Sequence, residues 1–323
     1  MDHMIDAEVL DLAHDPASEF RAAVLNGLAQ LQKTIPSKFF YDAEGSRLFD
    51  HICALPEYYP TRTETGILRA SVGAIAAALP PQVVLVEYGS GASVKIRLLL
   101  DALDRPAAYI PIDISGGHLR ASASVLAFDY PKVAVIPVCA DFTRPTALPP
   151  ALPEGPRVGF FPGSTIGNFH PPDAKRLLRS FHRQLGPQGR LLIGIDLKKD
   201  PAVLHAAYND AVGVTAAFNR NLLVRANREL AASFDLDAFE HLAFWNPAAG
   251  RVEMHLRSRI RQTVFVGGRP FRFAAGETIH TENSYKYSVD EFTALGRAAG
   301  FATVAAWTDA RQLFSVLMLA DEG

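Results

Sequence analysis

Residues 83–95 read VVLVEYGSGASVK, an apolar run of strand length that ends in the glycine pair Gly89 and Gly91. Apolar residues at helical spacing follow directly, from Ile96 to Leu103. This order predicts a buried parallel strand, a tight turn at which the backbone approaches a ligand, and the first turn of a helix. The glycine pair alone is weak evidence for a dinucleotide site, because Val94 stands where that fingerprint has its third glycine.

Acidic residues at the ends of successive strands strengthen the prediction of a ligand site. Glu87 closes the first strand, and the next strand ends in Asp113, which can accept hydrogen bonds from ribose hydroxyls. A third strand, predicted over residues 133–138, leads into Asp141 and Phe142, an acid and a ring suited to the edge and face of adenine. Together these strand ends predict a nucleoside pocket. The arrangement resembles the S-adenosylmethionine site of class I methyltransferases more than an NAD site.

Strands and helices alternate from residue 81 to residue 197, as in a doubly wound parallel sheet. A fourth strand, predicted over 158–161, leads into the loop PGSTIGNFHP at residues 162–171, and a fifth strand is predicted over 190–196. The loop after the fourth strand borders the same crevice as the glycine turn. Asn168 in this loop is a candidate substrate-holding residue, although Gly and Asn also serve ordinary turns.

The alternation breaks after residue 197, where a helical region gives way to segments with the patterns of antiparallel strands. Residues 251–261 alternate between an apolar face and a face with Glu253, His255 and three arginines, which predicts a half-buried strand with one solvated face. Gly267 and Gly268 predict a hairpin turn. So long a stretch between strands of the sheet predicts an inserted α+β domain.

The α/β pattern resumes at residue 288, and its last two strands are expected to form an antiparallel hairpin. We therefore expect a Rossmann-like methyltransferase domain of residues 61–197 and 288–323. A substrate-binding domain should comprise residues 16–60 and 198–287. Near the junction, Thr61 and Glu64 have the spacing of a capping box, which predicts that a helix begins at Thr61.

The composition is that of a soluble globular protein, with 49% hydrophobic and 20% charged residues. A formal net charge of −2 gives no general attraction to nucleic acid or to anionic membranes. We find no apolar run of membrane-spanning length, and the acidic start at residues 1–6 lacks the features of a signal peptide. Two cysteines imply no disulfide framework, and the ten histidines show no metal-ligand spacing. We expect a cytoplasmic monomer without a bound metal.

Several stretches of the chain jointly resemble one family. They are FFYDAEGS at 39–46, LPEYYPTRTE at 55–64, GSTIGN at 163–168, VTAAFNRN at 214–221 and TENS at 281–284. Together these motifs resemble the L-histidine Nα-methyltransferases of ergothioneine biosynthesis. The likeness runs from about residue 16 to the C-terminus. Members of this family make hercynine, the trimethylated betaine of histidine, from three molecules of S-adenosylmethionine.

The resemblance implies a set of ligand contacts. Residues implied to hold histidine are Tyr58, Gly163, Asn168, Tyr208, Met254, Glu282, Asn283 and Ser284. Residues implied to hold S-adenosylmethionine are Gly89, Lys95, Asp113, Asp141 and Phe142. Tyr41 is the candidate catalytic residue, since its hydroxyl could assist the amine by hydrogen bonding.

The residue types suit these roles. Side chains two apart on a strand project to the same side, so Glu282 and Ser284 can meet one imidazole ring. Neutral imidazole has one donor and one acceptor nitrogen, which a carboxylate and a hydroxyl satisfy. Asn168 and Tyr208 can donate to the substrate carboxylate, and Met254 can pack on the ring, although a core position is the usual place for a methionine.

Other functions are compatible with parts of the sequence. A methyltransferase for another amino acid or biogenic amine would use the same cofactor site. An NAD-linked oxidoreductase could use the glycine pair and Asp113, but Val94 and the lack of a clear hydride-site acid disfavour it. A non-catalytic nucleoside sensor would keep Asp113 and Asp141 without needing a polar histidine pocket.

Overall fold

The computed structural model describes residues 9–11, 16–91, 94–144, 148 and 152–323, which fall into two compact units. The first unit comprises Met1–Ala13, Pro60–Lys198 and Lys286–Gly323, and the second His14–Tyr59 and Lys199–Tyr285. Two sequence-based expectations lie outside the described residues: the turn positions Ala92 and Ser93, and the N-terminal residues 1–6.

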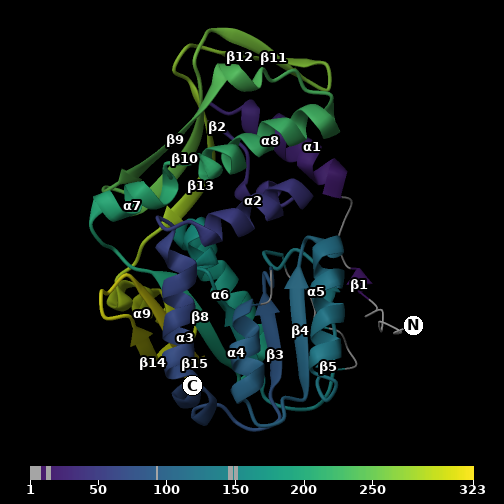
Figure 1. The fold of residues 1–323 in the computed structure, drawn as a ribbon, viewed down its shortest axis with the longest axis vertical. Coiled ribbons are helices and arrows are strands. Elements are labelled where there is room, and N and C mark those ends of the chain that lie inside the picture. The colour runs from purple at the N-terminus through teal and green to yellow at the C-terminus, as the bar shows by residue number, and fades with distance from the viewer. Residues whose placement is uncertain (1–8, 12–15, 92–93, 145–147, 149–151) are drawn as a thin grey trace. The chain divides into compact units, whose positions relative to one another are not determined.

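The first unit is built on one mixed sheet with the strand order β1-β6-β4-β3-β7-β8-β15-β14, and β5 pairs with β4 (Figure 1). These strands are β1 (Leu10–Asp11), β3 (Val84–Tyr88), β4 (Ala108–Asp113), β5 (Ala134–Val135), β6 (Val138–Cys139), β7 (Arg157–Phe161), β8 (Arg190–Asp196), β14 (Phe301–Thr308) and β15 (Phe314–Asp321). The pairs from β1 to β8 are parallel, whereas β15 runs antiparallel to β8 and to β14. The predicted doubly wound sheet and its closing hairpin are confirmed.

Helices cover both faces of this sheet. They are α3 (Tyr59–Ala77), α4 (Val94–Ala102), α5 (Gly116–Asp129), α6 (Pro171–Leu185) and α9 (Val289–Arg297), with the short 3-10 helix η2 (Thr165–Asn168) after β7. On one face, Leu68 of α3, Ile96 of α4 and Leu126 of α5 share a core cluster with Leu85 of β3. On the other face, Phe181 of α6 stacks on Tyr88 with a centroid distance of 3.8 Å. Burial on both faces explains why the central strands read as continuous apolar runs.

Two predicted element boundaries in this unit are wrong. The strand expected over 133–138 is split into β5 and β6, because Pro137 between them has no N–H to give to a ladder. Helix α3 begins at Tyr59, and Glu64 is not the second half of a capping box. Glu64 is 0% exposed, and its carboxylate pairs with Lys95 and accepts the N–H of Gly163 at 2.8 Å.

The second unit contains the sheet β2-β13-β10-β9 and a separate hairpin of β11 and β12. Its strands are β2 (Lys33–Thr34), β9 (Phe239–Asn246), β10 (Arg251–Ser258), β11 (Gln262–Val266), β12 (Arg269–Phe273) and β13 (Thr278–Tyr285). Its helices are α1 (Pro16–Leu28), α2 (Ala43–Ala54), α7 (Pro201–Tyr208) and α8 (Val214–Leu230), with 3-10 helices η1 (Ser37–Phe40) and η3 (Leu236–Ala238). The predicted glycine turn at Gly267 and Gly268 is confirmed, with φ of +54° and +82°.

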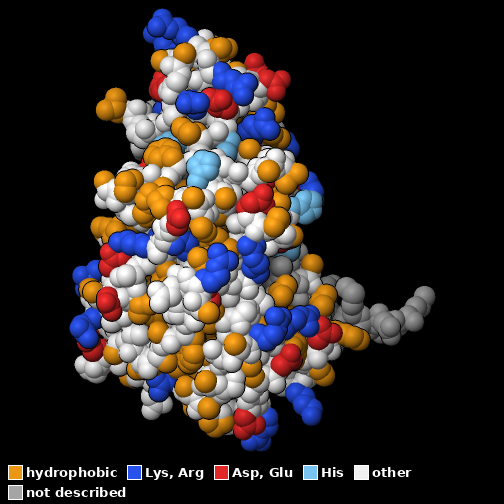
Figure 2. Space-filling view, turned by 60° about the vertical axis from the view of Figure 1, so that its left-hand side comes forward, with side chains coloured by type: hydrophobic (Ala, Val, Ile, Leu, Met, Phe, Trp, Pro, Cys, Tyr) orange, Lys and Arg blue, Asp and Glu red, His pale blue; other side chains and the backbone are white. Residues whose placement is uncertain are grey.

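The face of β10 that we expected to be solvated is partly buried. Glu253 and His255 are each 6% exposed, because the ring of His280 on β13 stacks on one side of His255 and the ring of Phe244 on β9 stacks on it as well. The arginines beyond them are ion-paired: Arg257 and Arg259 both contact Glu240. Figure 2 shows Lys or Arg and Asp or Glu side chains interspersed on the face drawn there.

Among the helices of the described segments, none combines the length and the apolar character that a membrane crossing needs.

We predict that Gly194→Ala strongly destabilises the protein. A Cβ on Gly194 would lie 2.0 Å from Oε1 of Glu64, and the buried carboxylate could move only by giving up Lys95 or the N–H of Gly163. The expected loss is roughly 2–4 kcal/mol of unfolding free energy, measured by denaturant unfolding. Gly73→Ala is the matched control, since Gly73 is exposed within α3 with nothing within 4 Å of an added Cβ. It should stabilise by about 0.5–1 kcal/mol, and a loss at both positions would contradict the role of Glu64.

A second prediction concerns Glu87, which is 2% exposed within β3 and accepts a hydrogen bond from Tyr109. Desolvation raises the pKa of Glu87 to about 8. Because the folded pKa lies above the ordinary value, this group's stabilising contribution is full at acid pH and is lost as pH rises from the unfolded pKa through 8. Glu87→Gln should therefore melt at the wild-type temperature near about pH 5 and at a higher temperature near about pH 8. At the higher pH its unfolding free energy should exceed that of the wild type by up to roughly 3–4 kcal/mol. A difference between the two proteins that does not change with pH would refute this assignment.

Candidate functional site

The carboxyl ends of β3 and β4 form the centre of the site in the first unit. The Asp113 carboxylate accepts the N–H of Gly91 at 3.2 Å and that of Ser115 at 2.9 Å, so it fixes the turn after each strand. Gly89 adopts φ of +76°, which favours glycine. A Cβ there would lie 3.5 Å from the ring of Phe142. Gly89, Asp113 and Phe142 are thus brought together, as the sequence predicted.

The surroundings of this turn suit a polar ligand. The hydroxyl of Ser90 is buried and has no hydrogen-bond partner among the described residues. A buried unpaired hydroxyl is costly unless a ligand or water completes it. Apart from Gly91 and its chain neighbours, no described residue has an atom within 4 Å of a Cβ built on Gly91. The open backbone, the half-buried acid Asp113 and the unpaired hydroxyl fit the ribose and amino-acid parts of S-adenosylmethionine.

Asp141 carries its own local contacts. Its carboxylate accepts the backbone N–H of Thr143 at 2.9 Å and lies 3.7 Å from the guanidinium of Arg144. Phe142 beside it packs against Phe161, with ring centroids 5.5 Å apart. These contacts fix the segment after β6. Asp141 and Phe142 are both half-buried.

Glu64 joins two further predicted residues, Lys95 and Gly163. Its carboxylate pairs with the Lys95 ammonium and accepts the Gly163 N–H, with φ of +77° at Gly163. Glu64 is not among the predicted site residues, because its spacing from Thr61 indicated a helix cap. The signal was present, since Ile67 and Leu68 lie three and four residues later and put Glu64 on the buried stripe of the helix. Asn168 lies in the same loop, half-buried at the end of η2.

The second unit gathers most of the predicted histidine contacts. The Tyr208 hydroxyl, at the end of α7, donates to Oγ of Ser284 on β13 at 2.6 Å. Met254 and Glu282 are direct partners across the β10–β13 ladder. Glu282 and Ser284 lie two residues apart on β13, so both side chains project to one side. Four of the predicted side chains therefore meet over one patch of the sheet.

An aromatic cluster contains Tyr41 and Tyr58, the two remaining tyrosines among the predicted site residues. Phe49 of α2 packs edge-on against Tyr41, at 5.6 Å, and against Tyr58, at 6.3 Å between centroids. Desolvation raises the pKa of Tyr58 well above its usual value, with a further rise from nearby Tyr208. The Tyr58 phenol therefore stays protonated and can donate a hydrogen bond.

Asn283 is not brought together with Glu282 and Ser284. It lies between them on β13 and pairs with Glu253 of β10, so alternation along the strand directs it to the opposite face. That face is the one with His255 and His280.

A group with potential metal ligands also lies on that face, although the sequence predicted no metal. Ligand atoms of Glu253, His255 and His280 all lie within 4.8 Å of one another. The sequence could not reveal the group because His280 comes from a different strand. The two imidazoles are stacked, however, with centroids 4.5 Å apart and planes at 10°. Nitrogen lone pairs lie in the ring plane, so parallel stacked rings do not direct them at one ion about 2.0–2.1 Å away.

Each imidazole of this group already makes a hydrogen bond. Nε2 of His255 lies 3.0 Å from the Glu253 carboxylate, and Nε2 of His280 lies 3.0 Å from the Glu282 carbonyl oxygen. Desolvation, with the neighbouring His255, lowers the pKa of His280 to about 4. The geometry fits a stack of neutral, hydrogen-bonded imidazoles better than a metal centre.

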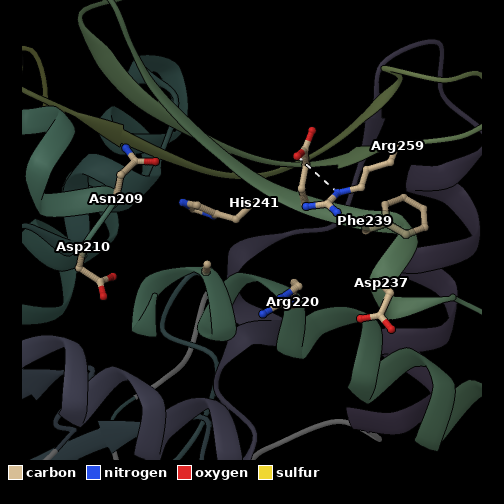
Figure 3. Close-up of a pocket in the computed structure, with 9 residues that line it drawn as sticks. Asn209, Asp210, Arg220, Asp237, Phe239, His241 and Arg259 are labelled. Carbon is tan, nitrogen blue, oxygen red and sulfur yellow. Dashed lines mark ion pairs between the residues drawn. The ribbon is translucent and has the colours of Figure 1, made fainter. Parts of the chain in front are cut away.

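A polar cavity of about 590 Å³ lies in the second unit (Figure 3). Its lining residues come from the end of α7, from α8, and from the segment around β9 and β10: Asn209, Asp210, Ala216, Arg220, Asp237, Phe239, Glu240, His241 and Arg259. None of the predicted histidine contacts lines this cavity. His241, which projects into it from β9, donates from Nε2 to the carbonyl oxygen of Tyr208 at 2.9 Å.

Comparisons with known proteins identify the family to which the chain belongs. The sequence model of a family described as "Histidine-specific methyltransferase, SAM-dependent" matches residues 20–321. A histidine N-alpha-methyltransferase from Mycolicibacterium smegmatis is 46% identical over 92% of this chain and 94% of its own length. Ergothioneine biosynthesis protein 1 from Neurospora crassa is 31% identical over 85% of this chain, which corresponds to 32% of that longer protein.

One solved structure has a similar fold. A possible exported protein from Bordetella parapertussis superposes with a TM-score of 0.52 at 13% identity, covering 94% of this chain and 79% of its own. That likeness concerns the fold, whereas the sequence matches extend over both units. The chain therefore belongs to the family of histidine-specific, S-adenosylmethionine-dependent methyltransferases.

Proposed function

We propose that this protein transfers methyl groups from S-adenosylmethionine to the α-amino nitrogen of L-histidine. The end product is Nα,Nα,Nα-trimethyl-L-histidine (hercynine), in ergothioneine biosynthesis. The observation that carries the proposal is the family match over residues 20–321, in which both the strand-end site and the Tyr208–Ser284 patch are present. We further propose that it acts in the cytoplasm as a monomer, without a nucleic-acid partner.

In the first unit, the proposed cofactor contacts are Gly89, Lys95, Asp113, Asp141 and Phe142. Asp113 would accept the ribose hydroxyls, and Asp141 and Phe142 would contact the edge and face of adenine. Bound S-adenosylmethionine supplies a methyl group on a positively charged sulfur. Lys95 pairs with Glu64, whose carboxylate accepts the N–H of Gly163, so the ion pair keeps the turn at Gly163 in place.

In the second unit, Glu282 and Ser284 are the proposed partners of the imidazole nitrogens, with Met254 packed on the ring. Asn168 and the Tyr208 hydroxyl are the proposed donors to the substrate carboxylate, and Tyr58 is a further predicted histidine contact. Gly163 remains a predicted histidine contact, whereas Asn283 is set aside because it lies on the opposite face of β13 from Glu282 and Ser284.

Methyl transfer depends mainly on the alignment of the amine with the methyl group. An amine attacking a methyl group in line needs no covalent enzyme intermediate, and correct positioning alone supplies a large part of the rate. The α-amino group of a peptide has a pKa of about 7.7–8.0, so the substrate amine must lose a proton before it attacks. We propose that Tyr41 assists that amine by hydrogen bonding.

The function is tested by incubating the purified protein with histidine and excess S-adenosylmethionine and following the products by mass spectrometry. Mono-, di- and trimethylated histidine should appear in turn, with the trimethylated product at the end point. Histamine, phenylalanine and tryptophan serve as competing amines. Preferred turnover of one of these, or accumulation of monomethylhistidine alone, would overturn the proposal in favour of a methyltransferase for another amine.

We expect Asp113→Ala to weaken S-adenosylmethionine binding by roughly ten- to a hundredfold, because hydrogen bonds to a charged group contribute about 1.5–3 kcal/mol. Isothermal titration measures the dissociation constant. Asp129→Ala is the control, since Asp129 is an acid at the end of α5 that pairs with Arg97 at the surface. Equal affinities of a folded Asp113→Ala variant and the wild type would remove Asp113 from the cofactor site.

We expect Glu282→Ala to raise the KM for histidine by roughly tenfold or more, because it leaves a ring N–H without its acceptor. Selectivity for histidine over phenylalanine should narrow, since a polar site rejects analogues that lack the matching group. S-adenosylmethionine affinity should not change. Glu277→Ala, which removes the partner of Lys33 just before β13, controls for general loss of stability in this sheet. Unchanged KM and selectivity in Glu282→Ala would show that another group recognises the ring.

A further inference from the structure

Asn219 is a fully buried polar residue on the sheet-facing side of α8, with 0% of its surface exposed. Its Nδ2 donates to the carbonyl oxygen of His255 and to Nδ1 of His241, each at 2.9 Å. Its Oδ1 accepts from the hydroxyl of Thr281 at 2.7 Å. One amide therefore ties α8 to β9, β10 and β13. We call Asn219, His241 and Thr281 the Asn219 relay.

The donors and acceptors of the relay are fixed by its end groups. The Tyr208 carbonyl oxygen can only accept, so Nε2 of His241 must carry the proton that it receives at 2.9 Å. A neutral His241 then has a lone pair on Nδ1, which accepts from Asn219. Desolvation lowers the pKa of His241, which keeps the ring in this neutral form. The amide orientation of Asn219 follows, with nitrogen toward His241 and oxygen toward Thr281.

The relay coincides with an irregularity in the sheet. Met254 pairs with Glu282, but the next residue, His255, pairs with His280, so Thr281 is an extra residue in β13. A bulge of this kind interrupts the ladder and redirects the side chains beside it. The Thr281 hydroxyl, which contacts Asn219, also lies 3.0 Å from the carbonyl oxygen of Met254. The relay therefore stabilises the bulge at the residue immediately before Glu282.

Each end of the relay adjoins a proposed histidine contact. Thr281 precedes Glu282, and its hydroxyl lies 3.0 Å from the carbonyl oxygen of Met254. His241 donates to the carbonyl oxygen of Tyr208, whose hydroxyl reaches Ser284. A shift of the bulge would turn Glu282, and a shift of the α7 end would move the Tyr208 hydroxyl. The relay constrains both displacements.

We propose that Asn219, with His241 and Thr281, forms a set of positioning residues that sets the histidine-binding geometry without touching the substrate. The inference rests on the proposed function. It assigns histidine recognition to a hydrogen-bonded support as well as to the residues that line the patch.

The decisive variant is Asn219→Asp. A carboxylate of the same shape still accepts from Thr281, but it cannot donate to the His255 carbonyl oxygen or to His241. We expect the KM for histidine to rise by at least roughly tenfold, with a smaller change in kcat at saturating histidine. The dissociation constant for S-adenosylmethionine should stay at the wild-type value.

Asn227→Asp is the matched control. Asn227 lies on the same helix, and its amide makes the same kind of paired contact, donating to the carbonyl oxygen of Phe234 and accepting the N–H of Phe234, both at 2.8 Å. It contacts none of the proposed histidine residues through these bonds. The substitution should lower the melting temperature without raising the KM for histidine.

A second pair of variants tests the relay if Asn219→Asp does not fold. Thr281→Val keeps the side-chain shape and removes the hydroxyl, whereas Thr281→Ser keeps the hydroxyl. The KM for histidine should rise in the valine variant and stay near the wild-type value in the serine variant. A purely structural role predicts instead that KM follows the loss of melting temperature in every variant, including Asn227→Asp.

The outcomes separate this inference from the proposed function. Failure of the wild-type protein to methylate histidine would overturn the proposed function itself. A wild type that methylates histidine, with a wild-type KM in both Asn219→Asp and Thr281→Val, would overturn only the positioning role. An equal rise of KM in Asn227→Asp would also overturn it.

Discussion

The buried carboxylate of Glu64 is the constraint on which the first unit depends. An isolated charge with no exposure would be costly, so its partners have to be in place. The ammonium of Lys95 on α4 and the N–H of Gly163 after β7 supply them, and Gly194 on β8 leaves room by having no side chain. One side chain on α3 thereby fixes the distance between a helix, a loop and the floor of the sheet. The helix that follows the glycine turn and the loop that contains Asn168 are held to the same point.

In the second unit a neutral buried side chain, the amide of Asn219, has a comparable role. Asn219 lies on the buried stripe of α8, beside Phe218 and Leu222. It satisfies three polar groups on three strands and so fixes the bulge in β13 rather than merely filling space. In both units a polar residue on the buried face of a helix determines the local geometry. A buried, fully satisfied polar group has directional partners and therefore specifies one arrangement more sharply than apolar packing does.

Much of the fold could be predicted because its signals are local. The central strands β3 and β8 are continuous apolar runs, the turn between β11 and β12 is marked by two glycines, and Asp200 caps a helix that starts with proline. The strand-end residues Gly89, Asp113 and Phe142 follow from the rule that ligands gather at the carboxyl ends of parallel strands. The two-residue strands β1 and β2 carry too little pattern to be recognised.

The features that sequence reasoning missed depend on contacts between distant residues. Glu64 was assigned to a local cap because Thr61 stands three residues before it, yet its partners are Lys95 and Gly163. The pairing of His255 with His280 follows a register shift that alternation within one strand cannot reveal. The resemblance to a known family supplied Tyr58, Tyr208 and Glu282, whose roles no spacing would have indicated. It did not supply Glu64 or Asn219, which act on other protein groups.

The proposed reaction explains why such rigid support would be useful. Over three methylations the reacting nitrogen changes from a primary amine to a quaternary ammonium, so no single hydrogen bond to that nitrogen can persist through the sequence. The imidazole and the carboxylate do not change, and contacts to them serve all three substrates equally. Specificity is therefore best placed in groups such as Glu282, Ser284 and Tyr208, whose positions are fixed by the protein and not by the reacting atom. Because alignment supplies much of the rate, a displacement of these groups would slow each of the three transfers. The hydrogen bond from Tyr208 to Ser284 and those between Asn219 and its three partners keep these groups in position.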